Sequence, residues 1–246
     1  MCVIIAKNKN DRLPTEKELK LCFEHNHDGA GFMYTDKGQV IIDKGYMTLE
    51  TFMARYVTLC KKYNNFKGKS LVIHCRIGTA GSNTPMNTHP YPLTKNVHEL
   101  HKLYFKTHLG IAHNGIIRDF DPDDDEGDIN DTQNFIKVYM TRKYKEDHKF
   151  YKRKFERDYI YDITSSKFAI LDKEDNLYTI GTFAVEDGLK FSNTYFKPYT
   201  PSVNSCYNYA DYWDDYEMTY AARRASHTAQ TQKYKWNSKT AKYERI

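Results

Sequence analysis

The N-terminal third of the chain alternates short hydrophobic runs with amphipathic stretches. Residues 2–6 form an apolar run, Cys-Val-Ile-Ile-Ala, that is typical of a short buried strand. Residues 31–35 and 40–44 are also strand-like, and the Asp-Lys-Gly sequence at 36–38 predicts a hairpin turn between them. Residues 70–76 predict a further strand.

Helical spacing of apolar residues marks three other segments. Thr15 and Glu18 have the spacing of a capping box, which predicts a helix beginning after Pro14. The clearest helical pattern covers residues 48–63, and another follows over about 132–144. These segments alternate with the strands, which predicts a layered α+β domain.

The rest of the first 197 residues contains further strands and two long loops. Strands are predicted at 109–113, 168–171 and 177–183. Gly, Asn and Pro predict a loop over 78–92, and an acidic loop covers 119–131.

Composition changes near residue 198. The last segment is polar, rich in Tyr and then basic, with weak apolar periodicity. We therefore predict a domain over 2–197 and a C-terminal tail over 198–246.

The chain of 246 residues has a formal net charge of +5, well short of a dedicated nucleic-acid-binding protein. No run reaches the roughly 20 apolar residues that a membrane-spanning helix needs. Five cysteines, an odd number spread along the chain, argue against a disulfide framework. We expect a cytoplasmic protein, in the host cytoplasm if the protein is viral.

No cofactor or metal is predicted. The chain has ten histidines, which are common zinc ligands, but no pair has the spacing of a zinc signature and no Cys-x-x-Cys occurs. The sequence Gly68-Lys69-Ser70 lacks the first glycine of a phosphate-binding loop, since Tyr63 stands there.

Cys2 is the residue that most directly suggests chemistry. Removal of the initiator methionine would leave this residue with both a thiol and an α-amine. An α-amine titrates near pH 7.7–8.0, so it can act as a general base for a thiol whose pKa is about 8.5. One residue would then supply nucleophile and base, although Cys2 could instead simply pack in the first strand.

Short motifs from Met1 to Thr194 occur in the same order as in a known protein family. They read Met1-Cys2, Asn26-x-Asp28-Gly29-x-Gly31, His74-x-Arg76-x-x-Thr79-x-Gly81, Asn87-x-His89-Pro90, His113-Asn114-Gly115-Ile116-Ile117, Asn130-Asp131-Thr132, and Glu186-Asp187-Gly188 with Phe191-Ser192-Asn193-Thr194. Over residues 2–195 the chain resembles the class II glutamine amidotransferases, N-terminal-nucleophile hydrolases that take ammonia from glutamine. Within this family the chain resembles the small stand-alone bacterial or bacteriophage type.

The resemblance implies a binding site for L-glutamine. Arg76 suits the α-carboxylate because its planar fork binds in two places, and Thr79 can add a hydroxyl. Asp131 suits the α-ammonium. Asn114 and the backbone N–H of Gly115 suit an oxyanion hole, because they present preorganised dipoles.

Three further residues have weaker roles in this scheme. Gly29 and Gly31 would let the backbone approach the nucleophile closely. His89 matches a family histidine that lines the site.

Simpler interpretations stay open for the individual residues. Arg76 could be a surface charge at a strand end, and Asn114-Gly115 could be a type I′ turn. Asp131 could merely cap the following helix. Two departures from the better-known synthases, Ile77 and Ala80, affect the rim of the glutamine pocket.

The family fold implied is a four-layer αββα sandwich with two antiparallel sheets face to face. The reaction implied is hydrolysis of glutamine through a γ-glutamyl thioester. The tail is too short for a synthase domain, so either a separate synthase partner, recruited through the tail, receives the ammonia, or the protein is a free-standing amidase.

Two alternatives to this function stay open. The protein could be an N-terminal-cysteine amidohydrolase that acts on another amide or a peptide. It could also be a non-catalytic interaction module whose basic tail binds nucleic acid or a protein partner.

Overall fold

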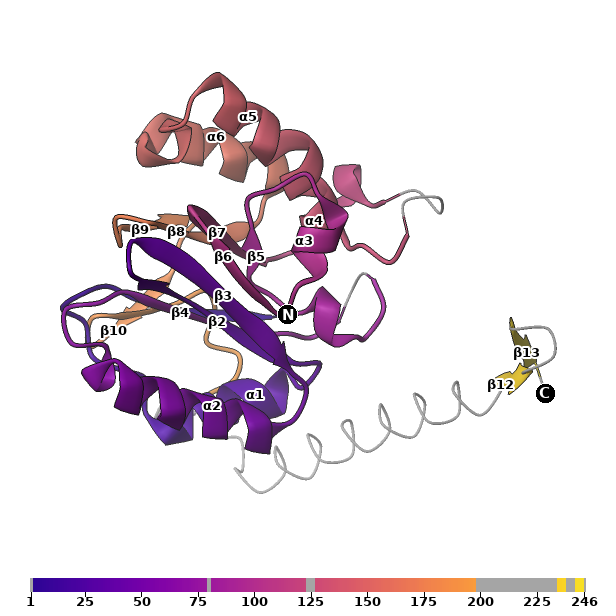
Figure 1. Ribbon diagram of the computed structural model, residues 1–246, viewed down its shortest axis with the longest axis horizontal. Coiled ribbons are helices and arrows are strands. Elements are labelled where there is room, and N and C mark those ends of the chain that lie inside the picture. Colours follow the sequence, from indigo (N-terminus) through magenta and orange to yellow (C-terminus); the bar gives the residue numbers. More distant parts are fainter. Residues whose placement is uncertain (1, 79–80, 123–126, 198–233, 238–241, 246) are drawn as a thin grey trace, which may run out of the picture. The chain divides into compact units, whose positions relative to one another are not determined.

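The computed structural model describes residues 2–78, 81–122, 127–197, 234–237 and 242–245 (Figure 1). The chain divides into two units, Met1–Lys197 and Pro198–Ile246. Among the described residues, none of the helices has the length and apolar character needed to cross a membrane.

In the described part of the first unit, an antiparallel seven-stranded sheet contains the N-terminal strand. Its strands, in spatial order, are β10 (Ala184–Glu186), β11 (Leu189–Phe191), β1 (Val3–Lys7), β4 (Leu71–Cys75), β2 (Ala30–Asp36), β3 (Gln39–Tyr46) and β6 (Tyr104–Thr107). Strand β1 is therefore interior, with β11 on one side and β4 on the other.

A second antiparallel sheet packs against the first. Its described strands, in spatial order, are β5 (Tyr91–Pro92), β7 (Leu109–Asn114), β8 (Lys167–Asp172) and β9 (Leu177–Ile180). Strands β7 and β8 contact both β1 and β3. At Gly110 the sheets come so close that an added Cβ would lie 2.9 Å from Met33 Sδ.

Helices lie on the outer side of each sheet (Figure 1). They are α1 (Glu16–His25), α2 (Leu49–Lys62), α3 (Val97–His101), α4 (Asp131–Phe135), α5 (Thr141–Glu146) and α6 (Lys154–Thr164). The π-helical segment Ile136–Met140 joins α4 to α5. The predicted helix over 132–144 is therefore part of a longer helical stretch.

Three apolar cores stabilise this arrangement, and strand β1 contributes to two of them. Val3 and Ile5 pack into the core that contains α1 and α2, whereas Ile4 and Ala6 pack into the core between the sheets. Successive side chains of a strand point to opposite faces, so a strand buried on both faces reads as an unbroken apolar run. A third core holds α4 and α6 against β7 and β8.

Several predicted elements are confirmed, and others differ in extent. The Thr15–Glu18 capping box is present at the start of α1, and Thr48 caps α2. The predicted loop over 78–92 contains a short 3-10 helix, Pro85–Asn87, and strand β5. The strand predicted at 177–183 ends at Ile180, because Gly181 adopts a positive φ of 77°.

The described residues of the second unit form one antiparallel hairpin, which the sequence did not suggest. It pairs β12 (Tyr234–Asn237) with β13 (Lys242–Arg245), with Trp236 opposite Tyr243.

Candidate active site

Cys2 lies just before β1, next to the end of β4. The register pairs Val3 with Cys75, so Cys2 falls beside Arg76. Its sulfur accepts a hydrogen bond from the Ile77 backbone N–H at 3.3 Å. Because Ile4 and Ala6 face the second sheet, the alternation of the strand brings Cys2 to the same face.

The electrostatic surroundings of Cys2 keep its thiol protonated at rest. Burial raises the pKa of the thiol, while the Ile77 N–H and the positive charge of Arg76 oppose this rise. A neutral thiol is a poor nucleophile, so an attack by Cys2 requires a base beside the sulfur.

Asn114 is the last residue of β7 and belongs to the opposite sheet. Its alternation with Ala112, which packs between the sheets, directs Asn114 towards the first sheet. Asn114 Nδ2 donates to Ser192 Oγ at 2.8 Å, and the backbone N–H of Ile4 donates to the same oxygen at 2.8 Å. One serine hydroxyl therefore joins the oxyanion-hole candidate to the strand that begins beside Cys2.

Gly115 occupies a position that excludes a side chain. A Cβ at this residue would lie 2.1 Å from Ser166 Oγ, and its φ is +155°. Asn114 is a strand residue paired with Lys167, so Asn114-Gly115 is not the type I′ turn that its sequence allows. The absent side chain of Gly115 therefore allows Ser166 to approach the backbone next to Asn114 closely.

Arg76 is buried, with 2% of its surface exposed, which excludes the interpretation as a surface charge. Its backbone N–H donates to Gly29 O at 2.8 Å. Its guanidinium donates through Nη1 to Asn83 Oδ1 at 3.3 Å and lies against Gly78, where an added Cβ would be 3.2 Å from Nη1.

Asp131 is the first residue of α4, and Asn130 rather than Asp131 is its N-cap. Asp131 Oδ2 accepts from the Ile117 N–H at 2.7 Å, and Oδ1 accepts from the Thr132 N–H at 2.8 Å. Oδ1 also accepts from the Thr132 hydroxyl at 3.3 Å, so both of its lone pairs are used. These bonds orient the carboxylate, and the second lone pair of Oδ2 is left to bind a cation.

Tyr91 connects these groups electrostatically. Burial raises the pKa of its hydroxyl, and a hydrogen bond from Asn130 Nδ2 at 2.7 Å opposes the rise. The charge of Arg76 also lowers this pKa, while Asp131 and Cys2 raise it. The charges of all three ionisable candidates therefore lie near enough to this buried hydroxyl to affect its pKa.

The two glycines of the second motif have other neighbours than expected. A Cβ at Gly29 would lie 2.6 Å from Thr88 Cγ2, and one at Gly31 would lie 2.3 Å from His89 O. The absent side chains thus admit residues 88–89 close to the backbone of these glycines. Thr79, the proposed hydroxyl donor, lies outside the described residues.

His89 belongs to a buried histidine cluster. Its ring stacks on His74 at 4.2 Å between centroids. The Thr132 hydroxyl contacts His89 Nε2 at 3.2 Å and His113 Nδ1 at 2.7 Å, and it donates to Asp131 Oδ1 at 3.3 Å. This network assigns the ring protons to His89 Nε2 and His113 Nδ1 and extends the support of Asp131 into the cluster.

Three residues at the site belong to the sequence motifs but had no predicted role. Asp28 accepts from the Gly78 N–H at 2.7 Å and from Asn83 Nδ2 at 2.8 Å, so it holds the segment after Arg76. Ser192 bridges the sheets, and Asn193 Nδ2 donates to Cys2 O at 2.6 Å. The available signal was their place within the motifs that contain Gly29 and Phe191.

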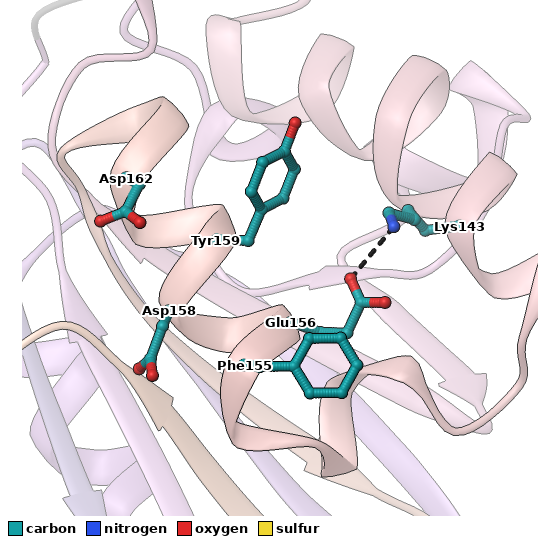
Figure 2. A pocket seen from close by; sticks show the side chains of 6 residues that line it. All are labelled: Lys143, Phe155, Glu156, Asp158, Tyr159 and Asp162. Atoms are coloured by element: carbon teal, nitrogen blue, oxygen red, sulfur yellow. Dashed lines mark hydrogen bonds and ion pairs between the residues drawn. The ribbon is translucent and has the colours of Figure 1, made fainter.

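A surface hollow lies elsewhere, between α5 and α6 (Figure 2). Its lining consists of Lys143, Phe155, Glu156, Asp158, Tyr159 and Asp162. Lys143 Nζ donates a hydrogen bond to Glu156 Oε2 at 3.0 Å. The residues that line this hollow are all different from those of the candidate site. Among the described residues, no group of three or more His, Cys, Asp or Glu side chains could hold a metal ion.

Comparison with known proteins gives no family assignment. No protein-family model matches the chain, and no curated protein sequence matches it.

Proposed function

We propose that this protein is an N-terminal-cysteine amidohydrolase of the class II glutamine amidotransferase type, which releases ammonia from L-glutamine. The observation that carries the proposal is the joint placement of four groups. Cys2 neighbours Arg76 across β1 and β4, and its strand is joined through Ser192 to Asn114. The charges of Asp131, Cys2 and Arg76 all affect the pKa of the buried Tyr91 hydroxyl. These residues come from distant parts of the chain.

The proposed fold is the four-layer αββα sandwich of the N-terminal-nucleophile hydrolases. Two antiparallel sheets with a shared apolar core, and helices on their outer sides, support it. In this fold Cys2 directly precedes the interior strand β1 and faces the opposite sheet.

The proposed reaction begins after removal of Met1. The α-amine of Cys2 takes the thiol proton, and the sulfur attacks the side-chain carbonyl carbon of glutamine. Asn114 Nδ2 and the Gly115 N–H stabilise the oxyanion. The intermediate collapses, the amide nitrogen leaves as ammonia with the transferred proton, and water hydrolyses the γ-glutamyl thioester to glutamate and the thiol.

Recognition of the amino-acid end uses opposite charges. Arg76 binds the α-carboxylate and Asp131 binds the α-ammonium. Thr79 and His89 are further contributors in this proposal. The ammonia goes to a separate synthase partner recruited through the tail, or to solvent, in the cytoplasm. Ile77 and Ala80, the latter outside the described residues, are the departures from the family's synthases that would favour another amide as substrate.

The test combines intact-mass analysis with an ammonia-release assay on glutamine. We expect the purified protein to lack Met1, the wild type to release ammonia, and Cys2→Ala to release none. Cys60→Ala, a change at a buried cysteine of α2, is the matched control and should keep activity. Retained Met1 with no ammonia release would favour a non-catalytic module. Activity on another amide with no competition by glutamine would favour a different substrate.

A further inference from the structure

We propose that Ser192 is a positioning residue that holds the Asn114 carboxamide in register with the Cys2 strand. This inference rests on the proposed function, because it assigns Asn114 to the oxyanion hole. Ser192 itself is neither the nucleophile, nor an oxyanion donor, nor one of the charged residues that bind glutamine.

The hydroxyl of Ser192 is completely buried, and two hydrogen bonds fill its acceptor capacity. Its oxygen accepts from Asn114 Nδ2 and from the Ile4 backbone N–H, both at 2.8 Å. A hydroxyl oxygen has two lone pairs, so both are in use. The two donors come from the two facing sheets. The hydroxyl oxygen of Ser192 therefore holds Asn114 and Ile4 at a fixed separation near the end of β1 that follows Cys2.

The bond to Ser192 also determines which hydrogen of Asn114 is available. A carboxamide nitrogen carries two N–H groups, and one of them is bonded to Ser192. The other is left for a developing oxyanion, and the carboxamide is anchored before substrate arrives. Preorganised donors stabilise a transition state without reorganisation during the reaction, so loss of this anchor should lower kcat more than it raises KM.

The surrounding backbone holds Ser192 itself in place. Its N–H donates to Ile4 O at 2.9 Å, and its carbonyl accepts from Lys167 Nζ at 2.6 Å. The next residue, Asn193, donates to Cys2 O at 2.6 Å. The Ser192-Asn193 pair therefore contacts the nucleophile residue, its strand and the sheet that carries Asn114.

The experiment is a double-mutant cycle on ammonia release, with Ser192→Ala, Asn114→Ala and the combined variant. We expect Asn114→Ala to lower kcat by roughly 10²–10³-fold, the effect typical of losing an oxyanion donor. Ser192→Ala should lower kcat by at least tenfold in the wild-type background and have little further effect when Asn114 is already Ala. Ser70→Ala removes another buried hydroxyl, bonded to Asp175 O, and should leave kcat unchanged.

Ser192→Cys covers the case in which Ser192→Ala fails to fold. Its thiol is close in size and is a weaker acceptor, so kcat should fall moderately, and this loss should also vanish in the Asn114→Ala background. Losses that multiply in the combined variants, or an unchanged kcat in folded Ser192 variants, would overturn the positioning role while the wild type remains active. A wild type without Cys2-dependent ammonia release would overturn the proposed function and this role together.

Discussion

The imidazole of His74 donates through Nε2 to the main-chain carbonyl of His113 at 2.9 Å, and this bond crosses from one sheet to the other. A carbonyl only accepts, so the proton is on Nε2 and the Nδ1 atom of His74 carries a lone pair. That Nδ1 atom is buried and has no partner among the described residues. Burial lowers the pKa of both His74 and His113 to about 3, so both rings are neutral near neutral pH.

Acid should destabilise the fold through these histidines. Their pKa values are about 6.5 in the unfolded chain and about 3 in the folded protein, so the unfolded state binds more protons between these values. The contribution of these histidines to the free energy of unfolding is therefore complete above about pH 6.5. Below that pH the free energy of unfolding falls by about 1.4 kcal/mol per pH unit for each histidine. Urea unfolding at a series of pH values measures this slope.

Substitution separates this effect from general acid denaturation. His74→Gln should flatten the dependence on pH below about pH 6.5, because one of the buried titrating histidines is gone, while His113 and His89, whose pKa burial also lowers, keep their contributions. His27 is exposed, so His27→Gln should leave the slope unchanged. Equal slopes in the wild type and both variants would show that the buried rings do not titrate in this interval.

Arg76→Gln should raise KM for glutamine. Hydrogen bonds to charged groups contribute about 1.5–3 kcal/mol, which corresponds to roughly 10- to 150-fold in affinity. Steady-state kinetics on glutamine gives KM, and an amide that lacks the α-carboxylate is the comparison. The substitution should affect this second substrate much less, and an equal effect on both would place Arg76 away from the carboxylate.

Gly115→Ala should impair both folding and catalysis. The new Cβ would meet Ser166 Oγ at 2.1 Å, and overpacking of this kind typically costs about 1–3 kcal/mol. Thermal unfolding and ammonia release measure the two effects. Gly68→Ala, at a positive φ of 70° with no atom within 4 Å of the new Cβ, controls for backbone strain alone.

Removal of the clash with Ser166 should restore stability to the Gly115→Ala variant. Ser166→Gly takes away the hydroxyl that the new methyl meets, so the combined variant should recover part of the lost stability. A Gly115→Ala protein as stable and active as Gly68→Ala would contradict the proposed close approach at this residue.

Elements with a local signal were predictable from the sequence. The capping box of α1 and the apolar run of β1 each depend on residues adjacent in the chain. Helix α6 was missed because Phe155, Tyr159 and Ile163 are exposed, while Ile160 and Thr164 are buried. Apolar residues therefore lie around much of this helix, and no single stripe indicates its inward face.

The site was predictable in its motifs and less so in its supporting contacts. Arg76, Asn114 and Asp131 were named from motif order. Pairing of Cys2 with Arg76, and of Asn114 with Ser192, depends on strand register and sheet packing, which act between distant residues. The close approach of His89 O to Gly31 was not predictable for the same reason, since it joins separate segments.

Trapping of the acyl-enzyme tests the central claim most directly. The wild-type protein is mixed with glutamine, quenched in acid during turnover, and its intact mass and peptide map are recorded. The account predicts a chain without Met1 that carries one γ-glutamyl group on the Cys2 sulfur. It also predicts no such adduct on Cys2→Ala. A chain that hydrolyses glutamine with the adduct on another residue, or that retains Met1 and forms no adduct, would contradict it.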